Sequence, residues 1–371
     1  MFDLTSAVGR QLWEPDRSLP LAKPYASVQG TRRRRDDRPV LQLNSLPVTL
    51  NPSDYENAFS SSNPRGDYGS LYAFRRFTDP LPRFSRYYSA SGKSMEDLYR
   101  YFVQSAVARA EDRRLSYTRR VLASARESFD LSGYTDMGGT PGEWRPVSAV
   151  PEDWYDTNQC GRFQSIDLDL SRPNSEDCRF RVIGSVKEEP KSMSWQTSSA
   201  QGRVTSVALD ANSMLQSLRF KCLAVTLNRP WLKPEILELK GLYLPGERKG
   251  SVSAGRMTRN MGIMPLLPTA LIVGIDSEIT AEWSGADRSH ISNALDNDAF
   301  LSLGPFVLNA GMSQGSGRKS RRAVFQKDTI YSQVLHVVGW LSSLVPLFPQ
   351  SDDPGLPPNG VPVKMLGSPD L

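Results

Sequence analysis

Residues Arg219–Leu227, RFKCLAVTL, are the stretch that decides most of what the sequence predicts about the fold. Successive side chains of a β-strand point to opposite faces of the sheet. In this stretch both faces would be apolar. One face would carry Phe220, Cys222 and Ala224, and the other would carry Leu223, Val225 and Leu227. A strand that is apolar on both faces belongs in the interior of a sheet, so we predict a central strand here.

Further strands are predicted on both sides of this one. Residues Phe163–Leu170 alternate, with Phe163 on a different face from Ile166, Leu168 and Leu170. The other predicted strands are Arg179–Val186, Leu266–Ile275, Glu278–Trp283, Leu301–Met312 and Val334–Leu341, with a short helix at Ser284–Leu295. We therefore expect a mainly antiparallel β-sheet or β-sandwich over about 140–348.

The clearest helical signal runs from Ser94 to Phe129. Ser94 and Asp97 have the spacing of an N-terminal cap, and Gly133 lies just beyond the end. Apolar residues recur at spacings of three and four in the first half, whereas arginines dominate the second half. We predict a long basic N-terminal helix, or a helix pair broken near Arg113–Ser116, at about 94–129, and hence the α+β class.

The chain divides by composition into four parts. Residues 1–40 are expected to form a flexible basic arm, and residues 41–135 a helical and irregular basic region. A strand-rich region follows at 136–350, which we expect to fold as one cooperative unit with 41–135. A proline-rich tail at 351–371 is expected to be disordered.

Cysteine content and hydropathy indicate the cellular compartment in which the protein is expected. The three cysteines, Cys160, Cys178 and Cys222, include no C-x-x-C pair, so neither a disulfide framework nor a thiolate zinc site is indicated. The first residues lack a secretory pattern, and the apolar run Val334–Phe348 is shorter than the ~20 residues of a membrane-spanning helix. We expect a soluble cytoplasmic protein.

Positive charge is concentrated in the N-terminal part. Residues 1–135 hold 21 Lys and Arg against 15 Asp and Glu, a net of +6, which leaves 45 − 21 = 24 against 40 − 15 = 25, a net of −1, for the remainder. An acidic macromolecule or protein surface should therefore meet the protein there. The candidate polyanion-binding residues are Arg32, Arg33, Arg34, Arg35, Arg75, Arg76, Arg83 and Arg86. The alternative is a solvated arm, followed by arginines that cover aromatic side chains packed on the core.

Two groups of carboxylates are candidates for catalysis. Glu152, Asp153 and Asp156 surround Trp154, a composition able to line a polar pocket. Asp167 and Asp169 share one face of a predicted strand and could divide acid and base roles. The alternatives are a surface turn anchored by aromatic rings and an ordinary solvated strand face. With two histidines in the chain and no nucleotide fingerprint, we expect neither a metal site nor a cofactor.

Two further segments offer contacts to partners. Trp231 stands between Pro230 and Pro234 and could be an interaction anchor, or it could cover the core at the end of the central strand. The apolar stretch Leu301–Met312 precedes a basic loop, Arg318–Arg322, as an inserting β-hairpin near 301–340 would. A core hairpin explains the same residues.

The leading hypothesis for function is a non-enzymatic binding or structural protein that uses its basic N-terminal half toward an acidic partner. The alternatives are a small-molecule hydrolase or lyase with a pocket around Trp154, and a membrane-acting protein that inserts the 301–340 hairpin. The sequence does not predict the oligomeric state.

Overall fold

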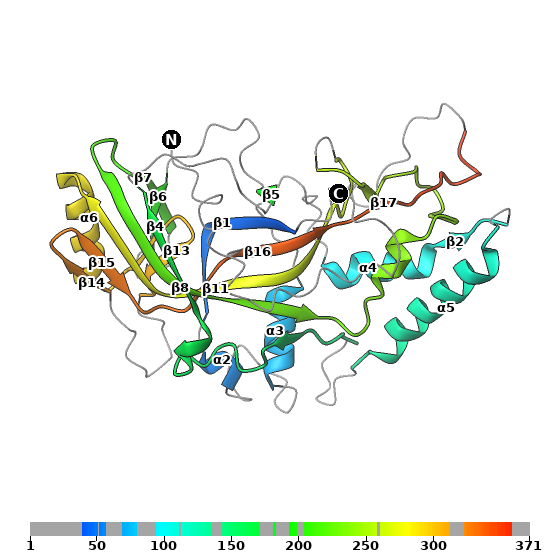
Figure 1. Cartoon of the computed structure of the whole chain (residues 1–371), viewed down its shortest axis with the longest axis horizontal. Helices are drawn as coiled ribbons and strands as arrows, with labels where there is room; N and C mark the ends of the chain where they lie inside the picture. Colours follow the sequence, from blue (N-terminus) through cyan, green and yellow to red (C-terminus); the bar gives the residue numbers. More distant parts are fainter. Residues whose placement is uncertain are drawn as a thin grey trace.

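A computed structural model of the chain describes residues 39–50, 52–56, 69–79, 94–110, 113–134, 143–170, 181–182, 193–198, 204–257, 260–311 and 323–357. The predicted arm up to residue 38, most of the loop Gly311–Arg322 and the predicted tail beyond residue 357 lie outside the described residues. The described chain is mainly antiparallel β-sheet with helices, which confirms the α+β prediction (Figure 1).

Two long antiparallel strands form the centre of the main sheet. They are β8 (Met214–Asn228) and β11 (Leu266–Glu282), which pair from Ala270 opposite Thr226 to Glu282 opposite Met214. The predicted strand Arg219–Leu227 lies within β8, and its interior position is confirmed because β8 has hydrogen-bonded neighbours on both sides. The predicted strands Leu266–Ile275 and Glu278–Trp283 are instead one strand, β11, with a bulge at Asp276, whose φ is 53°.

Along the outer side of each long strand lie two shorter strands, one after the other. On the outer side of β8 lie β3 (Ser148–Val150) and β4 (Gln164–Asp169), and on the outer side of β11 lie β16 (His336–Leu344) and β15 (Thr329–Ser332). Next to β16 comes β1 (Val40–Thr49), with β5 (Arg181–Val182) parallel to it, and next to β15 comes β14 (Val324–Gln326).

The sheet separates two hydrophobic cores, as the two-faced pattern of β8 requires. Leu223, Val225 and Leu227 belong to the first core, whereas Phe220, Cys222 and Ala224 belong to the second. The predicted alternation around β4 is also confirmed, because Phe163 lies in the first core and Ile166 and Leu168 lie in the second.

Helices cover the face of the sheet that carries the first core. They are α2 (Ser53–Glu56), α3 (Gly69–Thr78), α4 (Met95–Ser105), α5 (Leu115–Leu131) and the 3-10 helix η3 (Pro234–Glu238). The range 94–129 thus holds a helix pair. It is interrupted because Ala106 is extended and the next residues form β2 (Val107–Ala108), which pairs with β9 (Leu242–Tyr243). Beside them, β10 (Ser253–Ala254) pairs with β17 (Leu347–Phe348).

A second sheet and one helix cover the opposite face. The sheet has the order β13-β12-β6-β7, with β6 at Ser194–Ser198, β7 at Val204–Ala208, β12 at Phe300–Leu303 and β13 at Phe306–Asn309. The helix is α6 (Gly285–Asp296). The predicted strand Leu301–Met312 is therefore a tight hairpin that turns at Gly304, whose φ of 55° suits glycine. A short 3-10 helix, η2 (Cys160–Arg162), precedes β4.

Candidate functional site

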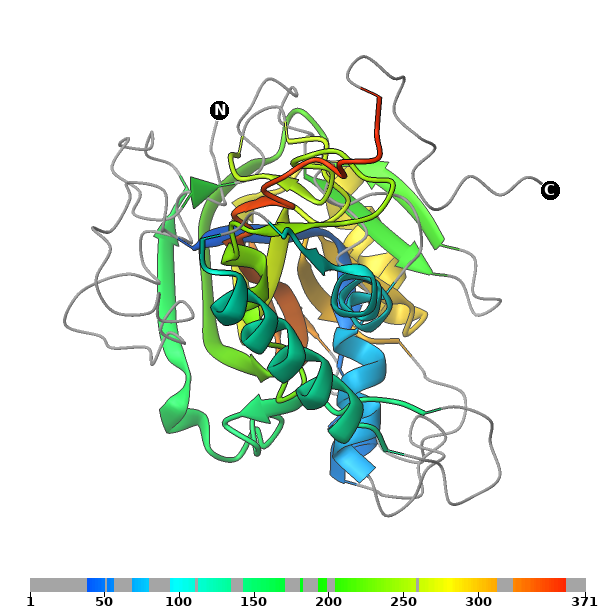
Figure 2. The ribbon, with the colours of Figure 1, turned by 90° about the vertical axis from the view of Figure 1, so that its right-hand side faces the viewer.

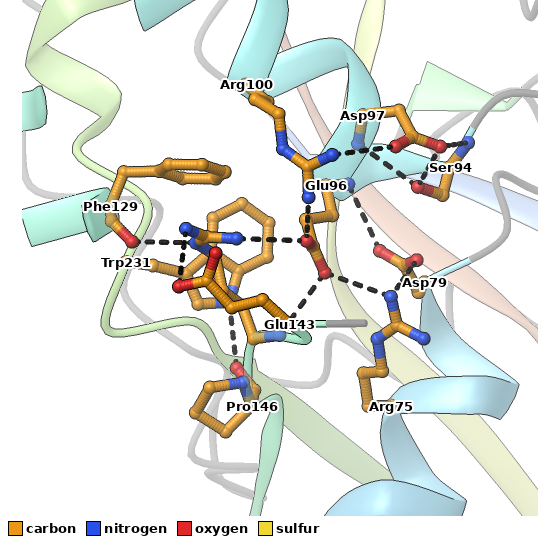
Figure 3. A network of polar contacts seen from close by, with 11 residues as sticks. Arg75, Asp79, Ser94, Glu96, Asp97, Arg100, Phe129, Glu143, Pro146 and Trp231 are labelled. Carbon is orange, nitrogen blue, oxygen red and sulfur yellow. Dashed lines mark hydrogen bonds and ion pairs between the residues drawn. The ribbon is translucent and has the colours of Figure 1, made fainter. Parts of the chain in front are cut away.

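Glu96, at the start of α4, is a buried carboxylate surrounded by arginines (Figure 3). Ser94 and Asp97 form the predicted cap as a reciprocal capping box, which fixes the first turn of α4. The Glu96 carboxylate then meets Arg75 of α3 at 2.9 Å, Arg100 one turn later at 2.5 Å, and Arg145 at 3.2 Å. Each contact is a charge-assisted hydrogen bond, the stronger kind.

Arg145 joins this group to the end of α5. Its guanidinium lies 3.5 Å from the centroid of the Phe129 ring, and its Nε donates to the Phe129 carbonyl oxygen at 2.7 Å. The Arg145 backbone N–H also donates to Glu96 Oε2, at 3.3 Å. The contacts around Glu96 therefore hold together α3, α4, the end of α5 and the segment that leads into β3.

Asp79 adds a second buried carboxylate. It accepts a hydrogen bond from the Glu96 backbone N–H at 3.1 Å and lies 3.4 Å from the guanidinium of Arg75. Burial raises the pKa of Asp79, and the neighbouring Arg75 opposes that rise. The two buried acids thus hold Arg75, Arg100 and Arg145 together, so this cluster fixes the positions of the helices.

The exposed surface of α5 presents a second group of arginines, which we call the α5 arginine group: Arg113, Arg114, Arg119 and Arg120. All four are exposed at the N-terminal end of the helix, and Arg120 lies 5.7 Å from the centroid of the half-exposed Tyr117 ring. Apolar packing holds the opposite face through Thr118, Leu122, Ala125 and Phe129.

Charges along α5 run against the helix dipole. The N-terminus of a helix favours acidic side chains and a side-chain cap, because its first N–H groups lack partners. In α5 the N-cap position is Arg114, with no side-chain cap hydrogen bond, and the first turn holds no acidic residue. The exposed acids Glu127 and Asp130 lie near the C-terminus. Packing thus stabilises α5 despite its charges, and arginines lie at one exposed end of the helix.

The position of α5 is fixed by its contact with α4. Arg126 donates from Nε to the carbonyl oxygen of Val103 at 2.7 Å and from Nη2 to that of Ala106 at 2.9 Å. These bonds satisfy the last carbonyl groups of α4. Figure 1 shows α5 at one end of the molecule, and in Figure 2 it faces the viewer. The α5 arginine group is therefore held on a rigid, exposed element.

Comparisons with protein families, curated proteins and solved structures found no match to this chain.

The predicted polyanion-binding residues are placed as follows. Arg75 belongs to the buried Glu96 contacts, so its charge is already balanced within the protein. Arg76, on the same helix, is exposed. Arg32, Arg33, Arg34, Arg35, Arg83 and Arg86 lie outside the described residues. The exposed α5 arginine group was not among the predicted residues, although the weak apolar pattern and dense arginines after Arg113 indicated an exposed basic helix.

The acidic residues around Trp154 do not enclose its ring. The indole is buried in the first core, whereas Glu152 is exposed and Asp153 pairs with Arg162 at the surface. Asp156 accepts a hydrogen bond from the Asn158 backbone N–H at 2.9 Å, as a turn residue does. Hydrogen bonds, from Arg162 to Asp153 and from Asn158 to Asp156, lower the pKa of both carboxyls. Both are thus ionised near neutral pH and unsuited to donating a proton.

Asp167 and Asp169 share the exposed face of β4, as their spacing predicts. Asp167 accepts a hydrogen bond from Arg219 Nε across the sheet at 3.0 Å, with both side chains more than half exposed. Such a pair is ordinary for a solvated strand face.

Trp231 and the first strands of the 301–340 segment, β12 and β13, lie inside the protein. Trp231 has no exposed surface, and its Nε1 donates to the Pro146 carbonyl oxygen at 2.8 Å, so it covers the core at the end of β8. Leu301, Leu303 and Phe306 are likewise fully buried in the second core. Insertion of this hairpin into a bilayer would require its removal from that core. Among the described residues, no helix has the length and hydropathy to cross a membrane.

The two histidines belong to other elements than the candidate carboxylates. His336 is fully buried in β16, with Nδ1 2.9 Å from the Val334 carbonyl oxygen. His290, on α6, lies beside Trp195. Within the described ranges, no group of three or more His, Cys, Asp or Glu side chains is arranged to hold a metal ion.

Proposed function

We propose that the protein is a non-enzymatic binding protein that contacts a polyanionic partner through the α5 arginine group. The observation that carries the proposal is the group of exposed arginines at the N-terminal end of α5, where the first turn of the helix holds no acidic residue. Backbone N–H groups and guanidinium groups at one helix end both favour a negative charge.

Its anchoring supports this role for α5. A helix held by Arg126 and by the core residues Leu122 and Phe129 presents its arginines from a fixed backbone, so binding has to order only their side chains. The arginines that contact Glu96 support the proposal indirectly, because they fix the neighbouring helix α4.

The test is binding to heparin and to double-stranded DNA at several salt concentrations. Replacing Arg113, Arg119 and Arg120 with glutamine should weaken binding strongly at low salt. If each contacts a phosphate, the slope of log affinity against log salt should fall by about 2.7 in magnitude. The matched control replaces Lys249, Arg256 and Lys327, exposed basic residues elsewhere in the chain, with glutamine. It removes the same charge and should change binding little.

Deleting residues 1–35 distinguishes binding by the predicted arm from binding by α5. The proposal fails if the intact protein binds neither heparin nor DNA at low salt. It also fails if the α5 variant binds as the control does, since the contact would then lie on the arm or elsewhere.

A further inference from the structure

The strand β7 forms an edge of the second sheet that is open in the described structure. All five of its residues are exposed, with Val204 at 62% and Val207 at 47%. The opposite edge of that sheet, β13, is fully buried against the main sheet. Natural proteins protect exposed edges with charged residues, proline or short length. The sequence of β7, VTSVA, contains none of these protective side chains.

The hydrogen-bond register shows which backbone groups of β7 face outward. Leu209 N–H donates to the Met193 carbonyl oxygen at 2.9 Å, so this pair is hydrogen-bonded. Bonded and non-bonded pairs alternate along an antiparallel ladder. The Ser194 carbonyl accordingly faces away from β7 and accepts from Gly304 N–H at 3.1 Å. It follows that the N–H and C=O groups of Val204, Ser206 and Ala208 point to the open edge.

We propose that β7 pairs antiparallel with β7 of a second copy of this chain, about a two-fold axis at Ser206. In this register Ser206 lies opposite Ser206 of the other copy, and Val204 lies opposite Ala208. Each of these pairs exchanges two N–H···O bonds, and the two four-stranded sheets become continuous. Because the strand is uncharged, the two-fold axis brings no like charges together.

A strand pair of this length by itself buries less than the ~1,000 Å² of a stable specific interface, so we expect a dimer that forms and dissociates with concentration. β7 and α5 lie toward opposite ends of the molecule (Figure 1). The dimer would therefore leave both α5 arginine groups free, and it stands independently of the proposed function.

The first experiment is sedimentation velocity of the full chain over a dilution series. Ser206→Pro removes one outward N–H and leaves the bonds to β6 intact, because Ser206 takes no part in them; proline is tolerated at an edge of this kind. This variant should remain a monomer at concentrations where wild type dimerises. Ser206→Ala keeps the N–H and should dimerise as wild type does.

Ser206→Cys gives a readout that does not depend on the fold of the proline variant. Hydrogen-bonded partners have Cα atoms about 5.5 Å apart, which is within the range of a disulfide. Mild oxidation should therefore link two chains, in a background with Cys160 and Cys178 replaced by serine. Cys222 stays inert because burial raises its pKa to about 12.

A monomer at all concentrations overturns the proposal. So does a dimer that Ser206→Pro does not weaken and Ser206→Cys does not link, since that dimer would use another surface. Protection of the Val204, Ser206 and Ala208 amides from hydrogen exchange in a strict monomer would show instead that the chain covers its own edge. Heparin binding plays no part in these readouts, so this proposal and the proposed function can fail separately.

Discussion

Arg145 and Glu96, 49 positions apart in the sequence, form an ion pair inside the protein. Arg145 Nη1 lies 3.2 Å from Glu96 Oε1, and only 3% and 2% of the two side chains are exposed. A buried ion pair adds little beyond what well-packed apolar residues would, but loss of one partner leaves an uncompensated charge. This pair therefore determines how α4 and the end of α5 are placed against the 143–146 segment.

Glu96→Gln should destabilise the fold by up to about 3–5 kcal/mol, because it leaves buried Arg145 with only the half-exposed Glu143, 3.4 Å away, as an anionic partner. Denaturant unfolding of the full chain measures this change. Glu127→Gln, on the exposed side of α5, is the control and should stay within about 0.5 kcal/mol of wild type. A loss below about 1 kcal/mol for Glu96→Gln would show that solvent reaches the cluster.

Leu223→Ala should lower the free energy of unfolding by about 2–5 kcal/mol, through lost burial and a residual cavity in the first core. Leu223 is 5% exposed and lies in the middle of β8. Met214→Ala, at the start of the same strand, removes a side chain of similar size that is 61% exposed. Equal effects of the two substitutions in denaturant melts would contradict the central position of Leu223.

Stability should fall as the pH drops from about 6.5 to about 4, because burial lowers the pKa of His336 to about 4. In this window the unfolded chain binds a proton at His336 that the folded protein does not, so the free energy of unfolding rises with pH. The full effect is roughly 3 kcal/mol, at 1.36 kcal/mol per pH unit. Unfolding curves measured at several pH values would show it.

His336→Gln should reduce this pH dependence. Burial also lowers the pKa of His290, which leaves a slope of the same sign, whereas the raised pKa of Asp79 opposes it at the acidic end of the range. His290→Gln is therefore the matched variant. If it flattens the curve more than His336→Gln does, the burial of His336 is not the main cause of acid sensitivity.

Ser116→Glu should stabilise α5 while weakening polyanion binding. An acidic side chain in the first turn favours the helix dipole by about 0.3–1 kcal/mol, and it lies one turn from Arg119 and Arg120. Ser289→Glu, exposed on α6 at the opposite end of the molecule (Figure 1), adds the same charge and is the control. Thermal melts and heparin retention measure the two effects. Ser116→Glu with unchanged retention would argue against binding at this end of α5.

Local patterns in the sequence determined the strand and helix types. The two-faced pattern of Arg219–Leu227 predicted an interior strand, and the spacing from Ser94 to Asp97 predicted the start of α4. Both succeed because alternation along a strand and capping at a helix end depend on near neighbours in the chain. The segments Ser194–Ser198 and Val204–Ala208 were missed as strands, because they are short and polar and acquire their strand structure by pairing with each other and with β12.

The positions of the candidate sites depended on tertiary structure. The sequence showed that the N-terminal part carries the positive excess, but Arg75 is balanced by Glu96 and Asp79, and α5 leaves its arginines exposed. Likewise, the residues around Trp154 and Trp231 had the composition of contact sites, and both rings are buried. Composition and spacing specify which groups are available. Whether a charge meets solvent or another charge is decided by contacts between residues far apart in the chain, such as Glu96 and Arg145, which no local pattern encodes.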